Sequence, residues 1–175
     1  MAAGYGNNWI RKGFRSIIPA TFLCLCALPG ISQPAWRSHA DKIIHQTDSL
    51  AASIQRTFHL SKVSNGNRDF RETWHYTLNN DQVAVFHIRY MLDSVEYSEV
   101  YYLDRGQLLC AEAYETIYDQ WNEDEVRWGE VHYFDNASLM QYIRLGKEKN
   151  SWGRGMAVQQ RFKERFHELN KNLRW

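Results

Sequence analysis

The chain has 175 residues, a length typical of a single domain. Its charges nearly cancel, with 21 Lys and Arg against 20 Asp and Glu. The formal net charge of +1 becomes −2 if residues 1–32 are removed, because that stretch holds three basic and no acidic side chains. This balance disfavours a nucleic-acid-binding protein, which usually carries an excess of basic charge.

The first 32 residues have the pattern of a signal peptide. Arg11, Lys12 and Arg15 precede an apolar run over residues 17–28, which is short for a membrane span. Gly30 and Ser32 then supply the small residues of a cleavage site after Ser32. An uncut N-terminal anchor is the alternative, and Pro19 inside the run disfavours it. We therefore expect a periplasmic or secreted protein whose mature part, residues 33–175, forms a single α+β domain without a transmembrane span.

The mature part keeps one cysteine, Cys110. It can form no internal disulfide and no cysteine-based zinc clip, so the hydrophobic core alone must hold the domain together. A small core residue on a strand is the simplest interpretation of Cys110.

A first helix is predicted over residues 38–60. Ser38 and Asp41 have the spacing of a capping box, and Ile43, Leu50, Ile54 and Phe58 fall along one stripe.

Three similar segments follow, "HYTLNNDQVAV", "VYYLDRGQLLC" and "HYFDNASLM". Each has an aromatic strand end, an Asn or Asp, a short polar turn and a new apolar strand, which predicts a repeated β-hairpin. We expect three-residue loops, with Gly106 suited to a positive φ and Ala137 less so. The predicted strands cover residues 69–78, 82–92, 95–103, 107–118, 125–134 and 138–147.

A second helix is predicted over residues 156–174. Val158, Phe162, Phe166, Leu169 and Leu173 recur at steps of three and four residues. Alanine at both Phe162 and Phe166 is expected to be severely destabilising, whereas alanine at both Arg161 and Arg165 is expected to cost little. The predicted fold is a six-stranded antiparallel meander with both helices packed on one face.

The motifs "YYLDRGQLL" and "YFDNASL" resemble those of small exported hairpin-repeat proteins of unknown function from Bacteroidota-type bacteria. The resemblance covers residues 70–145. It implies an exported α+β protein and supplies no catalytic residues.

Charge is unevenly distributed along the mature chain. Residues 93–125 carry a net charge of −9, and residues 144–174 carry +6. The two segments either attract each other inside the fold or offer an acidic sheet surface to a basic partner.

The later strands and the loop between them hold many aromatic and acidic side chains. A two-sided core in a curled sheet would account for the aromatics as well as a binding surface does. The candidate ligand-binding residues are Tyr102, Tyr114, Trp121, Glu123, Asp124, Trp128 and Tyr133.

No catalytic motif, cofactor motif or metal-binding motif is present in the sequence. His75 and His87 are expected to lie diagonally on the polar face of the first hairpin, with no evident third metal ligand. We therefore expect a non-catalytic binding protein with no cofactor, whose partner is a protein, peptide or glycan of the cell envelope. The alternatives are a small periplasmic hydrolase with carboxylate chemistry and a subunit of an envelope assembly.

Overall fold

The computed structural model describes residues 34–63, 69–118, 125–146, 153 and 155–173. The predicted signal peptide lies outside these residues. Two helices flank a seven-stranded antiparallel sheet in chain order, and no described helix is long and apolar enough to cross a membrane. The elements are α1 (Ala35–Ile54), β1 (Arg56–Val63), β2 (Asp69–Asn79), β3 (Gln82–Leu92), β4 (Val95–Asp104), β5 (Gln107–Ile117), β6 (Glu125–Asp135), β7 (Ser138–Gly146) and α2 (Met156–Asn172).

The α+β class and the antiparallel meander are confirmed, but the predicted strand count of six is wrong. Residues 56–63 form the additional strand β1, although residues 56–60 were expected to end the first helix. Gln55 has extended backbone angles, and Phe58 then pairs with Trp74 of β2 at a ring-centroid distance of 5.5 Å. Because β1 alternates between half-buried and exposed residues, its period is that of a strand.

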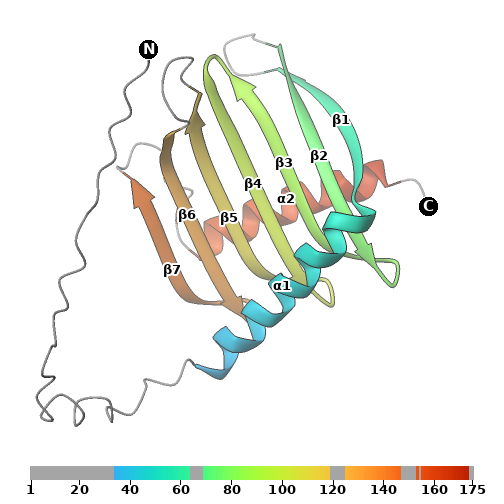
Figure 1. The fold of residues 1–175 in the computed structure, drawn as a ribbon, viewed down its shortest axis with the longest axis vertical. Helices are drawn as coiled ribbons and strands as arrows, with labels where there is room; N and C mark the ends of the chain where they lie inside the picture. The colour runs from blue at the N-terminus through green and yellow to red at the C-terminus, as the bar shows by residue number, and fades with distance from the viewer. Residues whose placement is uncertain (1–33, 64–68, 119–124, 147–152, 154, 174–175) are drawn as a thin grey trace, which may run out of the picture. The chain divides into compact units, whose positions relative to one another are not determined.

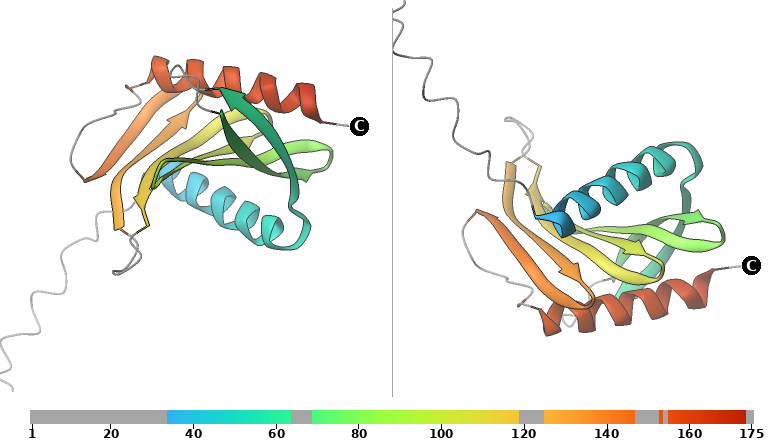
Figure 2. Two further views of the ribbon diagram at one scale, coloured as in Figure 1. Left: turned by 90° about the horizontal axis from the view of Figure 1, so that it is seen from above. Right: turned by 90° about the horizontal axis from the view of Figure 1, so that it is seen from below.

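The two helices cover opposite faces of the sheet, so the prediction that both pack on one face is wrong (Figures 1 and 2). Neighbouring residues of a strand point to opposite faces, and both faces are apolar. Phe86 and Tyr101 join the core cluster that contains Val158 and Phe162 of α2. Their neighbours Val85 and Tyr102 join the cluster that contains Ala40 of α1. Each face therefore receives its own helix, and the core is two-sided.

The three repeated hairpins share one construction. Their turns have two residues, each with a positive φ: Asn80-Asp81, Arg105-Gly106 and Asn136-Ala137. After each turn, one residue of the second strand has no partner in its hairpin, which is a β-bulge. The bulge residues are Ala84, Leu109 and Met140.

The predicted three-residue loops are therefore wrong, and the register shifts with them. Tyr76 pairs with Phe86, whereas a three-residue loop would place it opposite Ala84, and His75 pairs directly with His87 instead of diagonally. Two-residue turns with positive φ match the right-handed twist of the strands, and the bulge restores the apolar side chains to their faces.

Replacing Ala137 with glycine is expected to raise the free energy of unfolding by about 1 kcal/mol. Ala137 has φ 65°, a left-handed conformation that disfavours a Cβ atom. Gly106 holds the same turn position at φ 79°, and a Cβ there would meet no atom within 4 Å. Gly106→Ala is therefore the matched control and should cost a similar amount through backbone strain alone. Urea denaturation measures both changes, and an unchanged or lowered stability of Ala137→Gly would contradict the expectation.

Candidate functional site

Helix α1 covers only part of its face of the sheet. In Figure 1 it crosses the end of the sheet that carries the three repeated turns, and no described helix lies in front of the other end. The side chains of this other end, on the α1 side, form what we call the open face. It comprises His59, Arg71, Thr73, Arg89, Met91, Ser98, Tyr114, Val126, Ile143 and Leu145, none of which is buried.

One row of paired residues crosses the open face from edge to edge. It runs from His59 through Thr73, Arg89, Ser98, Tyr114 and Gly129 to Leu145. The ring of Tyr114 lies over Gly129, where a Cβ would come within 2.8 Å of it. The row is polar on β1–β4 and ends on β7 at Leu145, which is 55% exposed. Val126 of β6, outside the row but on the same face, is 50% exposed.

Three histidines line the polar end of the sheet on this side. His75 Nδ1 lies 2.8 Å from Thr57 Oγ1, His59 Nδ1 lies 3.1 Å from Thr73 Oγ1, and His87 Nε2 lies 2.7 Å from Ser98 Oγ. Burial and the nearby Arg89 lower the pKa of His75, and the same causes lower the pKa of His87 to about 4. Within the described residues, no three potential metal ligands are placed to share an ion.

The stability of the protein is expected to fall by about 3 kcal/mol between pH 7 and pH 4 through His87 alone. The pKa of this histidine is 6.5 when unperturbed and about 4 in the fold. The unfolded chain therefore binds the proton first, and the stabilisation, complete above pH 6.5, is lost as the pH falls toward 4. His87→Gln should remove this part of the pH dependence, as measured by urea denaturation across that range. Parallel pH curves for the two proteins would contradict the assignment.

A group of carboxylates and tyrosines lies where α1 meets the open face. Asp48 of α1 accepts a hydrogen bond of 3.0 Å from the Tyr102 hydroxyl, and Glu112 accepts one of 3.0 Å from Tyr114. Burial raises the pKa of Glu112, and Asp48 adds to the rise, while the hydrogen bond from Tyr114 opposes it. Asp48 and Glu112 therefore form a pair of like-charged groups on the α1 side.

The candidate ligand-binding residues do not come together as one surface. Tyr114 belongs to the open face, whereas Tyr102 and Tyr133 are buried among the residues beneath α1. The guanidinium of Arg37 lies 3.8 Å from the centre of the Tyr133 ring. Trp128 is buried on the opposite side of the sheet, where it pairs with Glu115. Trp121, Glu123 and Asp124 lie outside the described residues.

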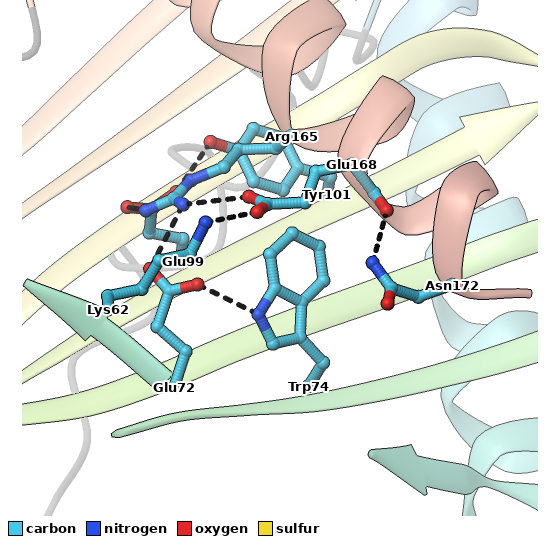
Figure 3. Close-up of polar contacts among 8 residues, drawn as sticks. All are labelled: Lys62, Glu72, Trp74, Glu99, Tyr101, Arg165, Glu168 and Asn172. Carbon is cyan, nitrogen blue, oxygen red and sulfur yellow. Dashed lines mark hydrogen bonds and ion pairs between the residues drawn. The ribbon is translucent and has the colours of Figure 1, made fainter. Parts of the chain in front are cut away.

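Acidic side chains of the strands form hydrogen bonds and ion pairs inside the fold, beneath α2 (Figure 3). Arg165 of α2 donates two hydrogen bonds to Glu99, of 3.1 and 3.0 Å, and one of 3.0 Å to Glu72. The Trp74 indole donates to Glu72 and the Tyr101 hydroxyl donates to Glu99, each at 2.9 Å. We call this group the Arg165 clamp: Arg165, Glu72, Glu99, Trp74 and Tyr101.

The electrostatics of the clamp fit a structural role. Glu72 and Glu99 are both 2% exposed. Burial alone would lower the pKa of Arg165, but the carboxylates of Glu99 and Glu72 raise it. Glu99 belongs to the acidic segment and Arg165 to the basic one, so the prediction that the two segments attract each other within the fold is confirmed for this pair.

A further buried polar group on the α2 side was not among the predicted site residues. Glu130 is fully buried and accepts a hydrogen bond of 2.7 Å from the Tyr142 hydroxyl. His132 is also fully buried, with its Nε2 atom 3.9 Å from Glu130. One pattern in the sequence could have indicated the burial of Glu130: an acidic residue lies between large apolar residues of a strand. Glu72, close to Trp74, shows the same pattern.

No family model matches this chain, and neither a curated protein nor a solved structure matches it. The resemblance to exported hairpin-repeat proteins therefore stays a prediction.

Proposed function

We propose that this is a non-catalytic binding protein that holds a protein, peptide or glycan of the cell envelope on the open face. The observation that supports the proposal is the open face, which presents the hydrogen-bonding groups of His59 to Ser98 at one end and the exposed apolar groups Val126, Ile143 and Leu145 at the other. Protein interfaces combine an apolar centre with polar surroundings in this way. Apolar groups gathered at one place on a surface also favour recognition over simple solvation.

Tyr114 lies between the two ends of the row and is the candidate residue that fits this function best. Its ring rests over Gly129, and its hydroxyl is held by Glu112. A tyrosine held in this way offers contact area at a low entropic cost. Tyr102 and Tyr133 would act only by supporting the surface from below.

Site-specific photo-crosslinking in the envelope fraction tests this function. A photoreactive phenylalanine analogue at Leu145 should yield a discrete crosslinked product, and the same analogue at the exposed Gln160 of α2 should not. Val126→Ser should weaken capture by the Leu145 probe. Equal crosslinking from both positions would contradict a specific binding face. A stoichiometric product that accounts for the whole population would favour the envelope-assembly subunit.

A small hydrolase is the second candidate function. The observation in its favour is the pair Asp48 and Glu112, because burial and the neighbouring Asp48 raise the pKa of Glu112, and a general acid needs a carboxyl group with a raised pKa. Chromogenic glycosides and esters test it. Turnover that disappears in Glu112→Gln, with folding intact, would favour the hydrolase over the binding protein.

Export to the periplasm or the medium is part of the proposed function. Mass spectrometry of the exported chain should find an N-terminus near Gln33, because the cleavage motif ends at Ser32. A full-length chain that stays in the cytoplasm would contradict this expectation.

A further inference from the structure

A cavity of about 530 Å³ lies between α1 and the turns of the first two hairpins. It is separate from the open face and falls within the range of about 300–1,000 Å³ that small-molecule sites occupy. On α1, its lining residues recur at helical spacing along one stripe that includes Lys42, Gln46 and Leu50. The remaining walls come from the turn regions of residues 79–84 and 103–105.

The bulge of the first hairpin accounts for the space. Ala84, Leu109 and Met140 are the equivalent bulge residues of the three hairpins. Leu109 packs into the core cluster beneath α1, whereas Ala84 has only a methyl group and lines the cavity. The first hairpin therefore lacks the larger side chain that the second has at this place, where Leu109 lines a smaller cavity of about 360 Å³.

The cavity has an apolar floor and a rim rich in carboxamides. Val83, Ala84 and Leu103 are buried and form the floor. The rim carries the exposed carboxamides of Gln46, Asn79, Asn80 and Gln82, whose side chains make no hydrogen bond to another described residue. A carboxamide both donates and accepts hydrogen bonds, as a hydroxyl group does. The apolar floor can therefore contact the C–H groups on the face of a sugar ring, while the carboxamides of the rim bind the hydroxyl groups at its edge.

The charges at the rim add a preference for one negative group. Lys42 and Arg105 are positive, and Asp104 is negative. Asp104 is engaged by His39 at 3.4 Å and by Arg105 at 3.5 Å, which leaves Lys42 as the cation with no described partner. We propose that this cavity is a binding site for a monosaccharide or disaccharide that carries a carboxylate.

NMR titration of the isotope-labelled mature protein tests the site. The probes are glucuronic and galacturonic acid, their neutral parents glucose and galactose, and acetate. At least one sugar acid should give saturable shift changes at residues 79–84 and 103–105, and should bind more tightly than its neutral parent and than acetate. No saturable change up to about 20 mM, or acetate binding as tightly as the sugar acids, would overturn the proposal.

Two variants make the test specific. Ala84→Leu places in the first hairpin the side chain that the second hairpin already has, and it should weaken binding at least about tenfold while the protein stays folded. Lys42→Ala should reduce the affinity for the sugar acid to that for its neutral parent. If Ala84→Leu fails to fold, Lys42→Ala still decides, because Lys42 is exposed. Unchanged binding of the sugar acid by either folded variant would overturn the proposal.

Discussion

Replacing both Phe162 and Phe166 with alanine is expected to unfold the protein or leave it barely folded. Phe162 is 8% exposed, and its ring centroid lies 5.9 Å from that of Tyr101 and 6.3 Å from that of Phe86. Phe166 is half-buried and lies 6.1 Å from Phe86. A buried Phe→Ala change costs about 3–5 kcal/mol, and a whole domain has only about 5–15 kcal/mol of stability.

Urea denaturation followed by circular dichroism measures this loss. Gln160→Ala with Lys163→Ala is the matched control, because both residues lie on α2 and are exposed. The control should change stability by less than about 1 kcal/mol. A harmless Phe pair would mean that α2 is a free arm, and the packing described for it would then be wrong.

The second helix was predictable because its evidence is local. Its apolar residues recur at steps of three and four, and the observed helix, Met156–Asn172, matches the predicted range of 156–174 within two residues. The choice of sheet face is not local. Val85 and Phe86, or Tyr101 and Tyr102, offer apolar groups to both faces, and nothing in the sequence assigns a helix to either.

Strand β1 was missed because its first residues also fit a helix. Ile54 and Phe58 are four residues apart, which is helical spacing and predicts one apolar stripe through both. What decides the conformation is a contact made far along the chain, where Phe58 stacks on Trp74 of β2. An edge strand that gains its pairing from such a contact leaves a weak local signal.

The candidate binding residues are divided between the two faces of the sheet, and this division depends on the strand register. A bulge adds one residue to a strand and changes which side chains share a face, and it has no distinct signature in the sequence. Trp128 lies five residues before Tyr133 in an unbroken stretch of β6, so alternation alone places it on the α2 side, away from Tyr114. The irregularity between Glu115 and Thr116 lies beyond Trp128 and places Val126 opposite Thr116, on the same side as Tyr114. The two-sided core was one of two interpretations that the alternating aromatics left open, and their pattern did not show which of them stay exposed.

Replacing Arg165 with alanine is expected to lower the free energy of unfolding by about 3–5 kcal/mol. Little cost was expected from the sequence for alanine at both Arg161 and Arg165. The structure revises this expectation, since the guanidinium carries three hydrogen bonds to Glu99 and Glu72, which are each 2% exposed. Without Arg165, two buried carboxylates lose the positive charge that compensates them.

The clamp makes a second prediction that separates charge from packing. Arg165→Met combined with Glu72→Gln and Glu99→Gln removes the three charges together while keeping side chains of similar size. This triple variant should recover most of the stability that Arg165→Ala loses, because a buried ion pair contributes little net stability relative to neutral groups that fill the same space. Glu164→Ala, on the exposed side of α2, is the control. If Arg165→Ala costs less than about 1 kcal/mol, water reaches Glu72 and Glu99, and α2 is held to the sheet by its phenylalanines alone.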